Sequence, residues 1–583
     1  MINITIKILE KYKFSLVLLF FSIHQLYYIP RVGVWWDEPY DQLGMKLTIG
    51  KLKYLIFGIE TREYRADFSD HEFFGMFYQA QAYLFSKLGK LFYSFDLDLL
   101  NIESEIHFVY FFRHVYLHLY ICLCLYIIYF LLKKIQSADF GFMYVLFLVL
   151  IPSINGYSLF DDKDIPFGLN LQIAFLCYIY FFKIYNSNER VSQSLVLLTG
   201  ISFGLLLLIR FNGVAFLILL LIAINIQRLK NILETNFIFK NIQIGFYALC
   251  VFFIGTIQGL SNYYNYLKNL YWQQFKVSTW SGETIVNGQT FYKSGDTSYI
   301  FKILLFKLPI IYLLALFVFF IFYKKVKNNL LAKSGLVFLL LFFGAFIAFK
   351  PAAYNYERQY IFIFFFINLL VAFCFSFLES KKLKYFSIFI FIISTIYSQS
   401  GLKEYKYIYV NELVNEKLIS TINQDCLEFG NCGIWSTDHL STSGISMANM
   451  IEKAEYPVFS CAPFHTISIF NKKNNFINLD NKYIFKSGVD TMDYTLERIN
   501  DSNSDEIKTV FKNRELFNSY LLENNVKRFL IISEHILTSN GNDCLNKLRS
   551  NNKLDCKIKE ENTVSLRSTK ITINYLLECS RNV

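Results

Sequence analysis

The sequence lacks several patterns that would each assign the chain to a different class of protein. It has no Cys-x-x-Cys pair, so a zinc site is a weaker explanation than disulfides for the six of its 11 cysteines that follow residue 400. It has no self-similar period of the solenoid type. Its formal net charge is +11, yet no separate basic patch exists to neutralise nucleic-acid phosphates. We therefore exclude a repeat protein and a nucleic-acid-binding protein.

Charged residues are scarce as well. They make up 18% of the 583 residues, whereas hydrophobic residues make up 54%, with 63 Phe and 41 Tyr. This composition is too apolar for an ordinary soluble protein of this length. Most basic clusters lie in short gaps between apolar runs, which is typical of membrane topology.

No small-residue cleavage site follows the first apolar segment, which runs from about Phe14 to Ile29. The residues from Arg31 to Trp36 are mostly bulky. An uncleaved first helix is thus favoured over a signal peptide, which is the competing interpretation.

Apolar runs long enough to cross a bilayer predict a polytopic α-helical membrane protein with about 11 transmembrane helices. The predicted spans are 13–30, 108–132, 138–154, 166–186, 193–209, 211–227, 241–261, 301–323, 334–350, 359–379 and 383–399. With the N-terminus in the cytoplasm, the basic clusters between spans all fall on the cytoplasmic side. Counting His71–Phe92 as a span would reverse this, so we expect that segment to lie along the outer surface within the first external loop, 31–107.

The chain divides into a membrane domain, 1–400, and an external soluble domain, 401–583. Residues 527–533 predict a buried strand, and 433–436 followed by 440–453 predict a strand and a helix. We expect a small α/β domain. Its six cysteines predict disulfides, with Cys426–Cys432 and Cys544–Cys556 as the expected pairs. A single Asn-x-Ser/Thr sequon on the external side, Asn500-Asp501-Ser502, favours a bacterial cytoplasmic membrane over an endoplasmic reticulum.

Two adjacent carboxylates, Asp37 and Glu38, directly follow the first span. Ionised groups are costly near lipid, so this acid pair predicts a function. A second acidic group, Asp161, Asp162 and Asp164, lies in a short loop before the span that starts near Pro166. A solvated turn is the alternative interpretation of this loop, but the predicted topology places both acid groups on the same face of the membrane.

Three cations are predicted on that face too. Arg210 lies between two spans, and Lys350 and Arg358 lie at the two ends of the short loop between the spans 334–350 and 359–379. Arg210 could also simply mark a turn. Acids suit a general base or a metal ligand, and arginines suit phosphate oxygens. Together they predict attack by an acceptor hydroxyl on a sugar carried by a lipid phosphate.

The order of these motifs resembles the GT-C glycosyltransferases that use polyprenyl- or dolichyl-phosphate-linked sugars, near the protein O-mannosyltransferases (glycosyltransferase family 39). The matching pieces are Trp36-Asp37-Glu38, Asp161 to Phe167, Lys307-Leu308-Pro309 and Tyr356 to Tyr360, over roughly residues 10–450. The chain departs from the family in two places: His71-Glu72-Phe73 stands where many members have His-Pro-Pro, and Arg358-Gln359 where many have Arg-His.

The resemblance implies that Asp37 is the catalytic base, and we predict catalytic roles for Glu38 and Asp162 beside it. It implies that the second acidic loop assists at the acceptor or at a metal. We predict that Asp161, Asp164, Arg210, Lys350, Arg358 and His71 bind substrate. No cofactor is firmly predicted; a divalent metal is an open alternative.

The predicted function is an inverting membrane glycosyltransferase that moves a sugar from a polyprenyl-phosphate-linked donor to a hydroxyl of a glycan, lipid or protein acceptor. The main alternative is a lipid-linked-sugar flippase or another transporter. Transporters place ionisable residues near the bilayer midplane and often contain inverted repeats, whereas here the acids lie near the surface and no repeat is visible. A receptor-like protein with a sensing tail is a further alternative.

Overall fold

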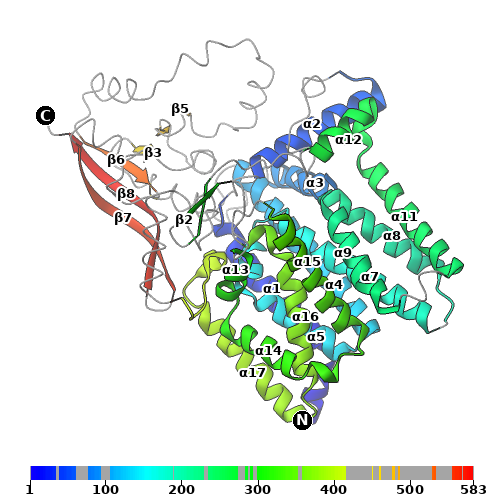
Figure 1. The fold of residues 1–583 in the computed structure, drawn as a ribbon. Helices are drawn as coiled ribbons and strands as arrows, with labels where there is room; N and C mark the ends of the chain where they lie inside the picture. Colours follow the sequence, from blue (N-terminus) through cyan, green and yellow to red (C-terminus); the bar gives the residue numbers. More distant parts are fainter. Residues whose placement is uncertain are drawn as a thin grey trace.

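The computed structural model shows a large bundle of helices and, beside it, a smaller group of strands from the C-terminal part of the chain (Figure 1). The residues that the structure describes are 2–33, 38–60, 76–93, 105–187, 189–228, 234–272, 283–286, 289–292, 299–351, 357–414, 450, 458–460, 476–478, 484–485, 528–533, 554–566 and 569–581.

Every apolar segment predicted to span the membrane is helical. The corresponding helices are α1 (Ile2–Tyr28), α4 (Glu105–Ile135), α5 (Ala138–Leu150) with α6 (Pro152–Tyr157), α7 (Asp164–Asn186), α8 (Gln193–Ile209), α9 (Gly213–Asn225), α11 (Thr235–Gly255), α13 (Tyr299–Lys307) with α14 (Ile310–Ile321), α15 (Leu330–Phe349), α16 (Phe362–Ser376) and α17 (Lys381–Ser398). The remaining described α-helices are α2 (Glu38–Phe57), α3 (Met76–Tyr93) and α12 (Tyr263–Tyr271), and short 3₁₀ turns include η8 (Arg358–Tyr360) and η9 (Lys403–Ile408).

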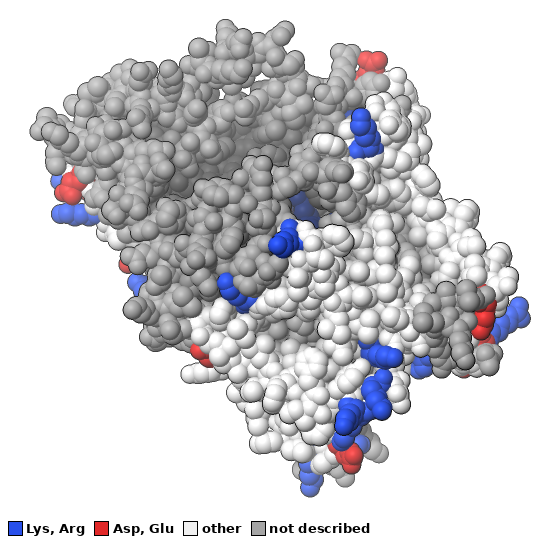
Figure 2. Space-filling view, viewed as in Figure 1, with Lys and Arg blue, Asp and Glu red and all other residues white. Residues whose placement is uncertain are grey.

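The helices have the lengths and surfaces of a membrane protein. Among the described residues, α7, α11, α15 and the Phe108–Ile135 part of α4 are long and apolar enough to cross a bilayer, and the α13–α14 pair makes a fifth if it is one span. Large apolar side chains such as Phe246 on α11 and Phe317 on α14 are exposed. Figure 2 shows a broad uncharged surface, with many of the visible Lys and Arg gathered at the end of the bundle where the N-terminus lies. The chain is an integral membrane protein; the number of spans and their orientation stay predictions.

Helices α7 and α16 form the centre of the bundle, and nearly all of their side chains are buried. The rings of Phe175 and Phe366 meet edge to face at 5.1 Å between centroids. At Gly168 the two helices approach closely: a Cβ there would lie 2.7 Å from Cε2 of Phe365. Because α7 is held so firmly, the loop at its N-terminus has a fixed position.

The segment 301–323, which the sequence predicted as one span, consists of two helices with a bend between them. Helices α13 and α14 meet at an angle of 110° at Leu308-Pro309. Proline lacks a backbone N–H and cannot continue α13. The freed carbonyls are bound instead by Asn411, whose Nδ2 donates to the oxygens of Leu305 (2.5 Å) and Leu308 (2.7 Å). The bend is thereby tied to the chain that follows the last predicted span.

The segment 71–92 was predicted to be amphipathic and to lie along the membrane surface; its described part, from residue 76 onward, belongs to helix α3, which ends at Tyr93. One side of α3 packs on α4, where Phe85 lies 4.9 Å from Tyr116 between ring centroids. Its other side exposes Leu84 and Leu91. The helix and its two-sided character are confirmed, while its position along a membrane surface stays a prediction.

The C-terminal part forms a six-stranded sheet in the order β5-β4-β3-β6-β8-β7. Its strands are β3 (Val458–Ser460), β4 (Phe476–Asn478), β5 (Ile484–Phe485), β6 (Arg528–Ser533), β7 (Leu554–Leu566) and β8 (Thr569–Arg581). A separate two-stranded sheet joins β1 (Glu283–Val286) to β2 (Gln289–Tyr292). The predicted strand at 527–533 is β6, which runs parallel to β3 and antiparallel to β8. The strand and helix predicted at 433–453 lie outside the described residues, apart from Met450.

The long β7–β8 hairpin connects the sheet to the helical bundle. Val564 and Leu566 near its tip belong to the buried apolar core of the bundle. The Ser565 amide donates to the Gly401 carbonyl at 3.4 Å. Gly401 has φ +91° and would, with a Cβ, approach the Ser565 oxygen to 2.7 Å, so glycine is required there.

A disulfide joins Cys556 to Cys579, which stand opposite each other on β7 and β8. The expectation of a disulfide in the tail is thus confirmed. The expected Cys544–Cys556 pair is wrong. The register of the β7–β8 hairpin places Cys579 opposite Cys556, and the disulfide joins these two residues. The expected Cys426–Cys432 pair lies outside the described residues.

We predict that peptide mapping of the intact protein under non-reducing conditions recovers a linked peptide containing Cys556 and Cys579. The closed loop separates the cysteines by 23 residues, so its loss should lower the free energy of unfolding by about 3 kcal/mol. A Cys556→Ser, Cys579→Ser variant measured by thermal unfolding checks this, with reduced wild type as the matched sample. Free thiols at both positions in unreduced protein would contradict the assignment.

Candidate functional site

The second acidic loop forms a tight turn at the start of the central helix α7. The Asp161 Oδ1 atom accepts hydrogen bonds from the backbone amides of Lys163 (3.1 Å) and Asp164 (2.9 Å). The side chains of residues 161–164 are all buried. These carboxylates do not belong to a solvated turn, which was the alternative interpretation from the sequence.

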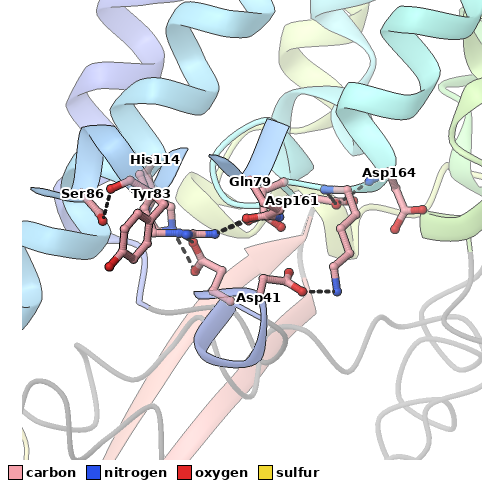
Figure 3. Close-up of polar contacts among 11 residues, drawn as sticks. Asp41, Gln79, Tyr83, Ser86, His114, Asp161 and Asp164 are labelled. Atoms are coloured by element: carbon pink, nitrogen blue, oxygen red, sulfur yellow. Dashed lines mark hydrogen bonds and ion pairs between the residues drawn. The ribbon is translucent and has the colours of Figure 1, made fainter. Parts of the chain in front are cut away.

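Asp162 is held by a buried arginine from α4. The Arg113 Nη2 atom lies 2.6 Å from Oδ2 of Asp162 and also donates to Oε1 of Gln79 on α3 at 2.7 Å. Gln79 Nε2 in turn donates to the same Asp162 oxygen at 2.9 Å. Figure 3 shows Gln79 close to Asp161 of the loop, with Asp41 and His114 on neighbouring helices. Breaking one partner of such a buried pair typically costs about 3–5 kcal/mol.

The same arginine reaches the first acidic motif. Arg113 Nε lies 3.8 Å from Oε1 of Glu38, which is the first residue of α2. His114 Nε2 is within 3.0 Å and 3.1 Å of the two Glu38 oxygens. Glu38 is only 1% exposed. Arg113 therefore links the acid that follows the first span to the acid that precedes α7, although the three residues lie far apart in the sequence.

Three further ion pairs among the described residues belong to the same cluster. Lys163 Nζ lies 2.8 Å from Oδ1 of Asp41 on α2. Asp164 is approached by two arginines: Nη2 of Arg210 at 2.5 Å from Oδ1, and Nε of Arg358 at 3.3 Å from Oδ2. Arg210 is the C-cap residue of α8, and Arg358 begins η8. We name Glu38, Asp41, Arg113, Asp162, Lys163, Asp164, Arg210 and Arg358 the buried ion cluster.

A fully buried ion pair joins Lys307 to Glu357, the residue that immediately precedes Arg358 in the chain. Lys307 Nζ is 3.2 Å from Oε1 of Glu357 and donates to the Tyr407 carbonyl at 2.8 Å. Ser153 Oγ donates to the same Glu357 oxygen at 2.9 Å. Burial raises the pKa of Glu357, which the nearby Lys307 ammonium opposes. This pair joins the α13–α14 bend, α6 and η9 to the residue that precedes Arg358.

Burial also changes the acidity of the α7 loop. It raises the pKa of Asp162 from its ordinary value of 3.8 to about 7; the carboxylates of Asp41 and Glu38 add to the rise, and Arg113 and Lys163 oppose it. Burial, followed by the neighbouring Asp164, raises the pKa of Asp161 well above its usual range. Asp162 can therefore take up or release a proton near neutral pH.

The structure brings together most of the residues that the sequence singled out: Glu38, Asp161, Asp162, Asp164, Arg210 and Arg358. Lys350 lies exposed at the C-cap of α15, with a left-handed backbone (φ 43°), and among the described residues no ion pair joins it to the cluster. Asp37 and His71 lie outside the described residues.

Sequence reasoning missed Arg113, His114, Gln79, Asp41 and the Lys163 side chain. Arg113 and His114 lie inside the predicted span 108–132. An ionisable residue within an apolar span is by default a candidate functional residue, so Arg113 carried a signal. Nothing in the sequence showed that Arg113 pairs with Glu38 and Asp162, because these residues come from distant segments.

Among the described residues, no three His, Cys, Asp or Glu side chains are grouped as metal ligands. The carboxylates of the cluster contact cationic side chains instead. The described part of the site therefore does not fit a metal held by this chain's carboxylates alone.

The chain has a GT-C-type membrane fold. The structure is similar to ArnT from Cupriavidus metallidurans in the apo state, with a TM-score of 0.50 and 9% identity over 97% of each chain. It is similar to the same protein bound to undecaprenyl phosphate, with a TM-score of 0.51 and 10% identity over 97% of each chain.

A weaker likeness is to the archaeal oligosaccharyltransferase AglB from Archaeoglobus fulgidus in complex with an inhibitory peptide and a dolichol-phosphate. Its TM-score is 0.41, with 10% identity over 90% of this chain and 70% of that chain. No protein-family profile matches the sequence, and no curated protein matches it either. The GT-C fold is thus shown by structure alone.

We predict that Asp162 makes the protein less stable as the pH rises from about 4 to 7. Its pKa is raised to about 7 in the folded state, so the folded protein binds more protons than the unfolded chain in that window, and the free energy of unfolding falls with pH. In Asp162→Asn this contribution disappears. Thermal unfolding of both proteins in detergent between about pH 4.5 and 8 checks it; identical pH profiles would count against the assignment.

Proposed function

We propose that this protein is a glycosyltransferase that moves a sugar from a polyprenyl-phosphate-linked donor to an acceptor hydroxyl on the external face of a membrane. The observation that carries the proposal is the convergence of buried carboxylates and arginines from α2, α4, α8 and η8 on the start of α7, within a GT-C fold. In the similar structure of ArnT, the bound molecule is undecaprenyl phosphate, which supports a lipid phosphate as the donor group here.

In this proposal Asp37 is the general base that takes the proton of the acceptor hydroxyl. It immediately precedes Glu38, whose carboxylate is fixed by His114 and Arg113. Such anchoring of the neighbouring residue would hold the start of α2 against the site. Asp162, with a pKa of about 7, would orient the acceptor or share its proton. A single displacement by the hydroxyl gives inversion at the sugar carbon.

Arg358 and Arg210 would bind the lipid phosphate and stabilise the charge that develops on it as the sugar leaves. Guanidinium groups suit this role because their planar fork matches phosphate oxygens, and charged groups that are already in position often contribute most to the rate of an enzyme. Lys350 and His71 stay proposed contacts to substrate. We further propose that the N-terminus is cytoplasmic, the C-terminal domain external, and the membrane a bacterial cytoplasmic one.

Replacing Asp37 with Asn should nearly abolish sugar transfer while leaving expression and lipid binding intact. The change keeps size and hydrogen bonding but removes the proton acceptor, so the loss should be roughly 10²–10⁴-fold. Transfer is measured by release of polyprenyl phosphate, with the native membrane fraction as the source of donor and acceptor.

The matched control is Asp139→Asn, which changes an exposed acid that pairs with Lys13 on α1. It should behave as wild type. An Asp37→Asn protein with near-normal turnover would remove the assigned base. Wild-type protein that binds the lipid-linked sugar and moves it across vesicles without transfer would establish the transporter alternative.

Replacing Arg358 with Ala should raise the KM for the donor, because the bound phosphate loses a charged partner, and should also lower kcat, because the charge that develops on the leaving phosphate loses the same partner. Lys at this position should recover only part of the loss, because it supplies charge without the planar fork. Steady-state rates over a range of donor concentrations separate the two parameters. Equal donor KM values in wild type and Arg358→Ala would show that Arg358 does not bind the donor.

A further inference from the structure

The carboxylate of Asp164 lies between the two arginines that the proposed function assigns to the lipid phosphate. Arg210 Nη2 lies 2.5 Å from its Oδ1, and Arg358 Nε lies 3.3 Å from its Oδ2. Each arginine thus contacts a different oxygen of one anion. The arginines come from distant segments, the end of α8 and the start of η8, and among the described residues Asp164 is the carboxylate that both of them contact at ion-pair distance.

A carboxylate in this position is a chemical equivalent of a phosphate. The guanidinium fork recognises two oxygens of a carboxylate or of a phosphate in the same way. The arginines proposed for donor binding therefore already contact an anion of this chain, each through one nitrogen and one oxygen. A lipid phosphate that contacts the same two guanidinium groups has to share them with Asp164 or replace it.

The main chain favours replacement, with the arginines as the moving groups. Asp164 is the first residue of α7, and its amide is bound to Asp161 Oδ1 at 2.9 Å. Its side chain is 2% exposed, whereas the Arg210 side chain is 14% exposed. The acid is thus fixed on a rigid central helix. The Arg210 and Arg358 side chains are longer and, at 14% and 8% exposed, less buried than Asp164, so we expect them to be the groups that turn toward an incoming lipid headgroup.

We propose that Asp164 occupies the position of the donor phosphate between Arg210 and Arg358 while the site is empty. It holds the two arginines in place, and it competes with the lipid phosphate for them. This inference rests on the proposed function and deepens it, because it assigns Asp164 a role opposite to that of a direct substrate ligand. A residue that merely supports the arginines would assist phosphate binding; a competitor weakens it.

The two roles predict opposite signs for one measurement. If Asp164 competes, Asp164→Asn tightens the binding of a lipid phosphate, since the amide keeps the shape but gives up the charge. Close charge pairs in buried sites couple strongly enough that the gain should be at least about tenfold in Kd. If Asp164 only supports the arginines, the same change weakens binding.

The experiment measures binding of farnesyl phosphate to the purified full-length chain in detergent, by calorimetry or intrinsic fluorescence. Asp164→Asn is compared with wild type and with Asp139→Asn as the matched control for loss of one acid. Asp164→Ser is the second variant, because serine is also a polar residue suited to the start of a helix. Farnesol and inorganic phosphate, tested separately, distinguish recognition of the whole lipid phosphate from recognition of its chain or of free phosphate.

We expect tighter binding of farnesyl phosphate in both Asp164 variants and no change in Asp139→Asn. We expect the gain to vanish when Asp164→Asn is combined with Arg358→Ala. Unchanged or weaker binding in the folded Asp164 variants overturns the inference. If Arg358→Ala and Arg210→Ala each bind farnesyl phosphate as wild type does, the proposed donor site itself is wrong, which is a separate and recognisable outcome.

Discussion

The positive charge of Arg113, buried in a largely apolar helix, is the constraint on which the site depends. A guanidinium cannot give up its proton in a protein, so burial obliges the fold to supply anions around it. Here they are Asp162 at 2.6 Å and Glu38 at 3.8 Å. The chain after the first span and the loop before α7 are thus drawn to one point on α4. The acids that would do the chemistry are also the counter-ions that this arginine requires.

A second buried pair extends this arrangement to the cations on the other side of α7. Lys307 and Glu357 have no exposed side-chain surface, and they join the sharp α13–α14 bend to the residue before Arg358. The Tyr407 carbonyl, which accepts from Lys307, adds the segment that leads into the C-terminal domain. The position of the proposed phosphate-binding arginine is therefore coupled to elements that are far apart in sequence. The β7–β8 hairpin contacts the same segment, at Gly401, through the Ser565 amide.

Much of this architecture could be predicted from the sequence, because apolar runs and their flanking charges report directly on the solvent around each segment. The helices and strand β6 belong to this group. The shared location of Glu38, Asp162 and Arg358 followed from one further step, the prediction of which loops lie on the same side of the membrane.

The sequence could not reveal which residues pair with each other. Cys556 pairs with Cys579 because of a hairpin register, and Asp162 pairs with Arg113 because α4 packs against α7. Both depend on tertiary contacts. The bend at Leu308-Pro309 was missed because hydropathy carries no information on the direction of a helix.

The central claim is that this network of buried charges forms a site for a lipid-carried phosphate. It is tested most directly by purifying the protein from its own membrane and identifying the bound lipid by native mass spectrometry, for wild type and for Arg358→Ala prepared in parallel. The account predicts a polyprenyl phosphate, with or without its sugar, on the wild-type protein and a clear loss of it from the variant. Recovery of bilayer phospholipids alone, in equal amounts on both proteins, would contradict it.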